Sequence, residues 1–492
     1  MLLGLDIGSS SIKAALVDSQ TGKCISTATA PQEEMPIDAL QTGWAEQHPD
    51  LWWKYVVEVL AILKKSYPDQ LSAIRAIGIS YQMHGLVCVD DAGKPVRPSI
   101  IWCDSRAVEY GAKAFNKIGS SWCLDHLLNS PGNFTASKLK WVKENEPQLF
   151  QSVKHFMLPG DYIAYRLTGE IATTNTGLSE GILWDFKSGK ISSELLTEYG
   201  IPESMASPLK PVFSEQGRIQ NHVAELLGLP SGVPVSYRAG DQPNNAFSLN
   251  VLNPGETAAT AGTSGVIYSV TDKIAYDPQS RVNTFLHVNH TEAQQRNGIL
   301  LCINGTGILN SWLRKNLNSG TAYSYEQMNS MAQSVQVGSD GLLFYPFGNG
   351  AERILENKNP GAALRGLDLN RHQQAHLMRA AQEGIVFAMK YGFEILQSMG
   401  SKTRVVRAGL SNMFLSPVFR EAFVNTLSVP VELYETNGAI GAAIGAGVGA
   451  KVFNSFEEAF HGLKPLREEK PESSKSESYQ QAYLQWRKHF EA

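Results

Sequence analysis

The chain has 492 residues, of which 43% are hydrophobic and 18% are charged, and its formal net charge at pH 7 is −4. This length exceeds what one hydrophobic core usually supports, so we expect roughly two to four domains. The weak negative charge gives no reason to expect nucleic acid or an anionic membrane as a partner.

Targeting and redox signals point to the cytoplasm. Met1 leads directly into an apolar strand pattern, without the basic and apolar regions of a secretory signal. The longest run of small and apolar residues, 438–450, is shorter than the ~20 residues that span a bilayer. The five cysteines form neither a CxxC pair nor a Cys/His spacing typical of zinc. We therefore expect a cytoplasmic protein with reduced thiols.

The first element in the chain is a β-hairpin with a small polar tip. Apolar residues lead into Asp6, a Gly-Ser-Ser turn follows at 8–10, and an alternating run continues from Ile12 to Val17. A glycine in such a turn lets the backbone approach a ligand closely, and neighbouring N–H and hydroxyl groups can surround phosphate oxygens. A single Gly/Ser-rich hairpin is weak support for this function, because many turns have this composition for steric reasons.

A second copy of the hairpin lies at 259–272. Aligning Gly8 with Gly262 superposes the hydroxyl residues that follow: Ser9 on Thr263, and Ser10 on Ser264. Two such hairpins predict a duplicated fold that binds phosphate between its halves. The second hairpin begins soon after a strand that ends at 240, which places the boundary near 246–255 and the domains at 1–247 and 248–492.

The remaining elements alternate between strands and helices. We expect, in chain order, a helix over 47–67, a strand over 74–80 that resumes at 86–89, mainly helices over 105–229, strands over 234–240 and 299–303, a helix over 371–400, strands over 404–408 and 431–434, and a short helix at the charged C-terminal end. Several strands end in Gly, Asp or Asn turns. This pattern predicts α/β domains with a ligand at the carboxyl ends of the strands.

Two aspartates at strand ends are candidates for chemistry. Asp6 precedes the first phosphate-type turn, and Asp241 precedes the second hairpin. Either residue alone could be only a turn former or a helix N-cap. Together they suit two tasks of phosphoryl transfer: holding Mg²⁺ through water and accepting the proton of an attacking hydroxyl.

Two further strand ends could line a polar pocket. Met83 and His84 interrupt a strand, and Trp102 and Asp104 end another. A core histidine beside a bulge is an equally good interpretation of His84, and Trp102 is at least as readily a core residue. The functional interpretation is a polar edge that contacts a small hydroxylated ligand.

Other nucleotide motifs are excluded or disfavoured. The chain contains no Gly-x-x-x-x-Gly-Lys-[Ser/Thr] sequence, so it is not a P-loop NTPase. The glycines at 445–449 lack the following strand and acidic residue of a dinucleotide fingerprint. Small residues at 438, 441, 442 and 445 instead predict a helix that packs closely on a sheet or ligand.

Taken together, these residues resemble the FGGY carbohydrate kinases, in the superfamily of sugar kinases, heat-shock chaperone ATPases and actin. The resemblance runs in order through nearly the whole chain: Asp6-x-Gly8, Trp52-Trp53, Met83-His84-Gly85, Trp102-x-Asp104-x-Arg106, Thr135-x-x-Lys138-Leu-x-Trp141, Gly240-Asp241, Gly262-Thr263-Ser264, Gly366-Leu367 and His376-Leu-x-x-Ala380-x-x-Glu383. It implies an α/β fold of two duplicated ribonuclease-H-like domains with a hinge and an interdomain cleft. The N-terminal domain would bind the sugar and the C-terminal domain ATP.

The resemblance also implies residue roles. Asp241 would be the general base that deprotonates the sugar hydroxyl, and Asp6 would position Mg²⁺ through water. The sugar would contact Met83, His84, Trp102, Asp104 and Gln242. The phosphates and adenosine of ATP would contact Ser9, Ser10, Gly262, Thr263, Ser264, Gly307, Gly409 and Asn412.

The Met-His-Gly and Trp-x-Asp-x-Arg motifs are similar to xylulokinases in particular. They imply ATP- and Mg²⁺-dependent phosphorylation of a ketopentose, D-xylulose to D-xylulose 5-phosphate. A kinase for ribulose, gluconate or glycerol is the nearest alternative, and a chaperone- or actin-like ATPase is an alternative of another class. The family's usual pattern changes at 350–354 and 408–412. We expect a sugar and ATP as partners, with a homodimer as one candidate assembly.

Overall fold

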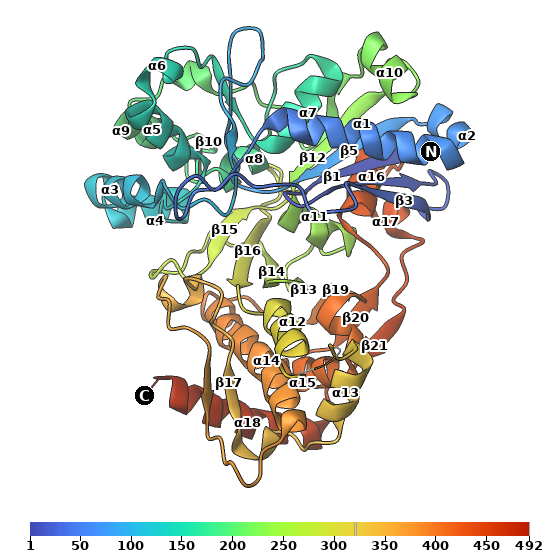
Figure 1. Cartoon of the computed structure of the whole chain (residues 1–492). Coiled ribbons are helices and arrows are strands. Elements are labelled where there is room, and N and C mark those ends of the chain that lie inside the picture. Colours follow the sequence, from blue (N-terminus) through green and yellow to red (C-terminus); the bar gives the residue numbers. More distant parts are fainter. Residues whose placement is uncertain (319, 321, 492) are drawn as a thin grey trace. The chain divides into compact units, whose positions relative to one another are not determined.

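A computed structural model describes residues 1–318, 320 and 322–491, and these residues form two compact units (Figure 1). The first unit contains Met1–Asn250, Phe285–Gln295 and Thr436–Leu463. The other described residues, from 251–284, 296–435 and 464–491, form the second unit. The first unit therefore takes in two segments from beyond residue 250, one of which carries the glycine-rich run of the C-terminal half.

The first unit is built on a six-stranded sheet of order β11-β12-β5-β1-β2-β3. Its strands are β1 (Leu2–Ile7), β2 (Ile12–Val17), β3 (Cys24–Ala30), β5 (Ala76–Tyr81), β11 (Phe213–Arg218) and β12 (Pro234–Gly240). The predicted N-terminal hairpin is confirmed, because β1 and β2 pair antiparallel. β1 also pairs parallel with β5, which pairs parallel with β12. The carboxyl ends of these three parallel strands therefore meet at one edge.

Side chains alternate between the two faces of this sheet, as strand geometry requires. Leu3 and Leu5 join the hydrophobic core with α1 (Pro49–Ser66) and α7 (Pro159–Thr168). On the other face, a Cβ on Gly4 would lie 1.8 Å from the carbonyl oxygen of Ala439 in α16 (Gly438–Gly449). Backbone thus packs on backbone, and the predicted close-packed helix of small residues is confirmed; Figure 1 shows α16 beside β1 and β5.

Shorter elements complete the first unit. They are α2 (Pro68–Ser72), α3 (Val108–Ile118), α4 (Ser120–Leu127), α5 (Thr135–Asn145), α6 (Pro147–Phe150), α8 (Asn175–Glu180), α9 (Ser193–Tyr199), α10 (Asn221–Leu227), α11 (Asp241–Ser248), α17 (Phe456–Phe460), the 3₁₀ turn η1 (Glu203–Met205) and the strand pairs β4 (Glu46–Gln47) with β7 (Ser99–Ile100), β6 (Val87–Val89) with β8 (His155–Met157), and β9 (Trp184–Asp185) with β10 (Lys190–Ile191).

The expectation that the strand over 74–80 resumes at 86–89 is wrong. β6 pairs antiparallel with β8 in a separate two-stranded sheet. The physical reason is a turn after β5, where His84 has a φ of 62°, in the left-handed region. The chain therefore leaves the main sheet between Tyr81 and Val87.

The second unit repeats the topology of the first. Its seven-stranded sheet has the order β15-β16-β14-β13-β19-β20-β21. The strands are β13 (Glu256–Ala261), β14 (Gly265–Thr271), β15 (Asn283–Leu286), β16 (Asn297–Ile303), β19 (Val405–Gly409), β20 (Val431–Tyr434) and β21 (Arg467–Glu469). In β16-β14-β13-β19-β20, two antiparallel pairings precede two parallel ones, as in β3-β2-β1-β5-β12. The duplicated fold and its second hairpin are confirmed.

Helices pack around a large core in the second unit. They are α12 (Gly307–Asn316), α13 (Tyr325–Gln333), α14 (Gln374–Ser398), α15 (Pro417–Leu427) and α18 (Ser473–Glu491), with β17 (Leu343–Tyr345), β18 (Ala363–Arg365) and the 3₁₀ turns η2 (Ser339–Gly341), η3 (Arg353–Leu355) and η4 (Asn412–Leu415). α14 packs on the sheet where Gly392 meets Leu301. None of the helices in the described ranges is long and apolar enough to span a membrane.

The expectation of a short C-terminal helix is wrong, because the helix is longer. α18 has 19 residues, and Tyr479, Tyr483 and Trp486 are fully buried in the core of the second unit. Their i, i+4, i+7 spacing puts them on one helical face. The polar residues between them hide this stripe in the composition of the segment.

Candidate active site

Asp6 lies at the carboxyl end of β1, next to the N-terminus of α16. A Cβ on Gly438 would lie 2.6 Å from Asp6 Oδ2, so only glycine allows this approach. The N-terminus of a helix favours a carboxylate because its first N–H groups carry partial positive charge. Burial raises the pKa of Asp6, while Lys13 and Ser80 act in the opposite direction. Asp6 is thus a partly desolvated carboxyl held by backbone geometry.

Asp241 is the first residue of α11 and follows β12 directly. β1 and β12 both flank β5 in parallel, so the ends that carry Asp6 and Asp241 meet at the same edge. Burial raises the pKa of Asp241 to about 7, and the charge of Asp6 adds to this shift. Hydrogen bonds from Gln242 favour the ionised form. A carboxyl with this pKa can take a proton from a hydroxyl group near neutral pH.

Met83 and His84 lie beside the Gly240–Asp241 junction. Met83 is 4% exposed, and a Cβ on Gly240 would lie 2.6 Å from its Cγ. His84 Nδ1 lies 2.8 Å from the carbonyl oxygen of Glu180. Because a carbonyl can only accept, Nδ1 carries a proton in this contact. The structure brings both predicted sugar contacts close to the predicted base.

Lys138 stabilises the turn that contains His84. Its buried ammonium donates to the carbonyl oxygens of His84 and Ile101, both at 2.9 Å. Burial lowers the pKa of Lys138 to about 7, against the opposing charge of Asp104. The motif around Lys138 is part of the family resemblance, but its contacts were not predicted from the sequence. Lys138 links the ends of the two strands that precede the predicted sugar contacts.

Trp102 and Asp104 differ in their surroundings. Trp102 is 51% exposed and its Nε1 donates to Ser9 Oγ at 3.2 Å, so the interpretation of Trp102 as a core residue is wrong. Asp104 is fully buried, and its carboxylate accepts from Arg106 and from the N–H of Ala45. Through these contacts, Asp104 stabilises its own loop. Contact between Asp104 and a sugar stays a prediction.

The turn of the first hairpin is tied to neighbouring loops. Gly8 N–H donates to the carbonyl of Ser11 at 3.1 Å. The carbonyl of Ser9 accepts from Gln47 at 2.7 Å, and that of Ser10 accepts from the N–H of Met35 at 2.8 Å. These hydrogen bonds fix the turn within the first unit. Its contact with phosphate stays a prediction.

In the second unit, the turn Gly262–Ser264 rests on the start of α12. Gly307 N–H donates to Gly262 O at 2.8 Å, and Ile308 N–H donates to Thr263 O at 3.2 Å. A Cβ on Gly307 would lie 2.3 Å from Gly262 O, so glycine is required there. Thr263 itself is exposed. The structure thus joins predicted nucleotide residues that lie more than 40 positions apart in the chain.

Gly409 and Asn412 approach the same turn from β19. Gly409 ends the strand, and its carbonyl accepts from Ser411 N–H at 2.8 Å. Asn412 has a φ of 51°, and its Nδ2 would lie 3.8 Å from a Cβ on Gly262. The carboxyl end of β19 and the tip of the second hairpin therefore meet. This arrangement is suited to a phosphate, because small residues expose the backbone.

Glu352 is a site residue that the sequence analysis missed. It is fully buried, and its two carboxylate oxygens accept from Asn304 N–H at 3.0 and 3.1 Å. Burial raises the pKa of Glu352 to about 7. It thereby ties the segment 350–354, where the family pattern changes, to the turn before α12. The unusual sequence of that segment was the available signal.

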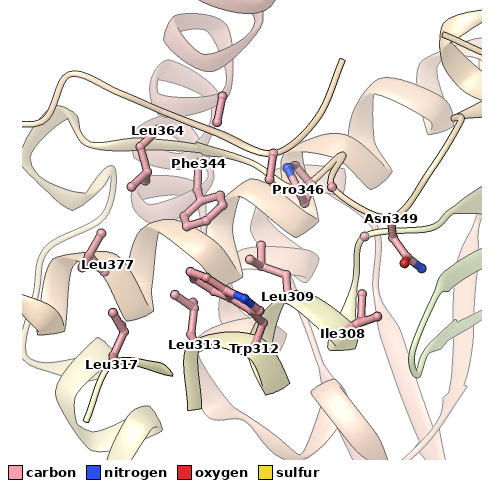
Figure 2. Close-up of a pocket in the computed structure, with 14 residues that line it drawn as sticks. Ile308, Leu309, Trp312, Leu313, Leu317, Phe344, Pro346, Asn349, Leu364 and Leu377 are labelled. Atoms are coloured by element: carbon pink, nitrogen blue, oxygen red, sulfur yellow. The ribbon is translucent and has the colours of Figure 1, made fainter. Parts of the chain in front are cut away.

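A hollow of about 510 Å³ in the second unit does not coincide with the carboxylates. Figure 2 shows that Ile308, Leu309, Trp312 and Leu313 of α12 line it, opposite Phe344 of β17. Its lining is mostly apolar and offers no titratable group. The desolvated carboxyls of Asp6 and Asp241 lie elsewhere, at the carboxyl ends of β1 and β12.

The chain also matches known proteins in sequence and in fold. The family model described as FGGY family of carbohydrate kinases, N-terminal domain, matches residues 1–248, and the C-terminal domain model matches 257–450. A xylulose kinase from Bacillus subtilis (strain 168) is 29% identical over 465 residues, covering 93% of this chain and 90% of the relative.

Solved structures share the whole fold. A xyloylose kinase from Brucella ovis has a TM-score of 0.90 at 26% identity, covering 99% of this chain and 98% of that one. A gluconate kinase from Lactobacillus acidophilus has a TM-score of 0.88 at 22% identity, covering 99% and 96%. At the latter identity, the likeness concerns the fold alone.

Proposed function

Because the chain belongs to the FGGY family of carbohydrate kinases, we propose that it transfers the γ-phosphate of ATP to a hydroxyl of D-xylulose. The observation that carries the proposal is the desolvated Asp241 at the end of β12, beside Met83 and His84. A chaperone- or actin-like ATPase gives no reason for Met83 and His84 beside this aspartate. Similarity to the xylulose kinases of Bacillus subtilis and Lactococcus lactis supports xylulose as the acceptor.

In the proposed reaction, the Asp241 carboxylate accepts the proton of the sugar hydroxyl. The hydroxyl oxygen forms a bond to the γ-phosphorus, and the bond from that phosphorus to the bridging oxygen breaks. The electron pair leaves with ADP, and the proton stays on Asp241. Since the transition state of phosphoryl transfer is loose, positioning the hydroxyl counts at least as much as removing its proton.

The residues present fit the nucleotide and the metal that such a reaction uses. A Cβ on Gly307 would lie 2.3 Å from Gly262 O, so the start of α12 packs directly on the turn, and Gly262 has no side chain to cover it, which suits a phosphate. Asp6 supplies a hard oxygen ligand of the kind that Mg²⁺ prefers. No group of three or more His, Cys, Asp or Glu able to hold a metal occurs in the described residues. As the family resemblance implies, Asp6 would hold Mg²⁺ through water, where the metal would neutralise phosphate charge.

We further propose a cytoplasmic location and leave the homodimer as a prediction. The five cysteines form no disulfide in the described structure, which fits a reducing compartment. Two of them, Cys88 and Cys123, are buried, and burial raises the pKa of both thiols to about 12. Such thiols are inert and serve packing.

A coupled assay of ADP release tests the proposal. The enzyme is mixed with ATP and Mg²⁺, and then with D-xylulose, D-ribulose, gluconate or glycerol, or with no acceptor. We expect the highest kcat/KM with D-xylulose and little ADP without an acceptor. Asp241→Asn serves as the matched control for contaminating kinases. A higher kcat/KM with another acceptor would reassign the sugar, and acceptor-independent ATP hydrolysis would favour the ATPase alternative.

A further inference from the structure

Glu180 is a buried carboxyl group that the proposed reaction does not use. It is the last residue of α8 and is 2% exposed. Its Oε1 has no hydrogen-bond partner within the described structure. An unpaired carboxylate is costly to bury, so a group in this environment either pairs with a cation or keeps its proton.

The described residues provide no ion pair for Glu180. The guanidinium of Arg238, near the same Tyr81 hydroxyl, is engaged by Asp161, with 3.1 Å between Nε and Oδ1. Asp161 is 2% exposed and carries the same sign of charge as an ionised Glu180. The Arg238 guanidinium is therefore already paired, and the nearby Lys138 ammonium donates to the backbone carbonyls of His84 and Ile101.

Burial and two neighbouring carboxyl groups also oppose a charge on Glu180. Burial raises the pKa of Glu180 well above its usual range, and the charges of Asp241 and Asp161 raise it further. A hydrogen bond from the His84 backbone to the carboxyl group and one from the Tyr81 hydroxyl act in the opposite direction. With Asp6 also close to Asp241, an ionised Glu180 would be the third negative charge at this edge of the sheet.

The position of Glu180 connects it to the reacting groups. A Cβ on Gly240 would lie 2.2 Å from Glu180 Oε2 and 2.6 Å from Met83 Cγ. The carboxyl thus packs directly on the backbone that precedes Asp241. The carbonyl oxygen of Glu180 accepts from His84 Nδ1 at 2.8 Å. One residue therefore touches both the backbone that supports the base and the predicted sugar contact His84.

We infer that Glu180 works as a neutral carboxylic acid that seats the Gly240–Asp241 junction and the Met83–His84 pair. It is a positioning residue: it fills the space against Gly240 without adding charge beside Asp241. Its effect on catalysis rests on the proposed function, whereas its protonation state rests on burial and neighbouring charges alone.

Stability as a function of pH tests the protonation state without any activity. Unfolded Glu180 loses its proton above its ordinary pKa, while the folded protein keeps it. Wild-type stability therefore falls with rising pH through this group, and Glu180→Gln abolishes the effect. From pH 5.5 to 8.5, the unfolding constant of E180Q relative to wild type should fall by up to about tenfold per pH unit.

The control for this measurement is Glu225→Gln, at an exposed position of α10. It should show no such trend. If E180Q does not fold, Glu180→Met must show the same slope, because it also has no proton to release. A carboxylate paired with a cation predicts the reverse: E180Q would lose stability relative to wild type as pH rises. That result, or a constant difference, overturns the inference.

Kinetics tests the positioning role. If Glu180 is neutral, E180Q preserves the charge beside Asp241, and the acid limb of kcat/KM for the sugar keeps its wild-type midpoint. If Glu180 is a carboxylate, its removal lowers the pKa of Asp241 and shifts that limb to lower pH. Glu180→Ala, which empties the space under Gly240, should reduce kcat by about tenfold or more, and the Gln variant should restore it. Equal kcat in E180A and wild type would overturn the role.

The two arms separate failure of this inference from failure of the proposed function. An enzyme that phosphorylates none of the four acceptors, but shows the pH-dependent stabilisation of E180Q, contradicts the proposed function and retains the neutral Glu180. An active xylulose kinase without that stabilisation contradicts only the inference.

Discussion

The carboxyl groups of Asp6 and Asp241 are electrostatically coupled across β5. Burial is the largest contribution that raises the pKa of Asp241 to about 7, and the charge of Asp6 is the second. The coupling follows from the parallel pairing of β1 and β12 with β5, which aligns their carboxyl ends. Two acids at one sheet edge acquire different surroundings: Asp6 faces a helix N-terminus, and Asp241 begins a helix of its own.

Asp241→Asn should retain sugar binding and lose turnover. The amide keeps the shape of the carboxylate but cannot take a proton. General-base catalysis typically contributes ~10²–10⁴-fold to the rate. Measuring kcat by coupled assay and sugar affinity by calorimetry separates the two effects. A folded variant with wild-type kcat contradicts the assignment of the base.

The pH profile should follow Asp241. The base acts as a carboxylate, so kcat/KM for the sugar should fall as pH decreases through about 7. Stability should change in the opposite sense. The folded-state pKa of Asp241 is raised above its unfolded value, so ionisation costs stability once pH exceeds the unfolded pKa. Asp241→Asn should therefore unfold at a higher temperature than wild type at pH 8, with the difference vanishing near pH 4. A profile of kcat/KM that stays flat from pH 5 to 8 is incompatible with this role.

Asp6→Asn should change both the metal requirement and the titration of Asp241. Loss of the carboxylate weakens the water-mediated hold on Mg²⁺, so half-maximal activity should need more metal. Loss of the neighbouring charge should also move the acid limb of the residual activity to lower pH, because Asp6 raises the pKa of Asp241. Unaltered Mg²⁺ dependence together with an unmoved acid limb would refute both roles.

Gly307→Ala should damage nucleotide binding selectively. The added Cβ would meet Gly262 O at 2.3 Å and push apart the turn and the start of α12. We expect an increase in KM for ATP with little change in KM for the sugar. Lys315→Ala, at an exposed position of the same helix, is the control. If both variants have the wild-type KM for ATP, the turn is not the phosphate site.

Gly4→Ala should destabilise the first unit. Its Cβ would lie 1.8 Å from Ala439 O, and backbone on both sides leaves no flexible side chain to yield. Overpacking typically costs about 1–3 kcal/mol, which chemical denaturation can resolve. Gly320→Ala is the matched control, because among the described residues its Cβ would meet only Asn318 Oδ1, at 4.0 Å. Equal denaturation midpoints for the two variants would show that α16 can move away from the sheet.

Much of the fold was legible in the sequence because its signals are local. Alternation, turn glycines and the repeat of Gly8-Ser-Ser at Gly262-Thr-Ser predicted both hairpins and the duplication, which the repeated strand order confirms. The same local logic placed Asp6 and Asp241 at strand ends. It failed for β6, where the left-handed turn at His84 takes the chain to a new partner, and for α18, whose aromatic stripe is diluted by polar residues.

What the tertiary structure alone decided is the environment of each side chain. No local sequence pattern predicts that Glu180 packs on Gly240 or that Lys138 links two strand ends. The same holds for the hydrogen bond that Arg106 donates to the carboxylate of Asp104. These contacts join residues brought together by long-range strand pairing and helix packing. Sequence patterns therefore determined which groups are present and on which elements, whereas desolvation and neighbouring charge, which set the pKa of Asp241, exist only once the chain has folded.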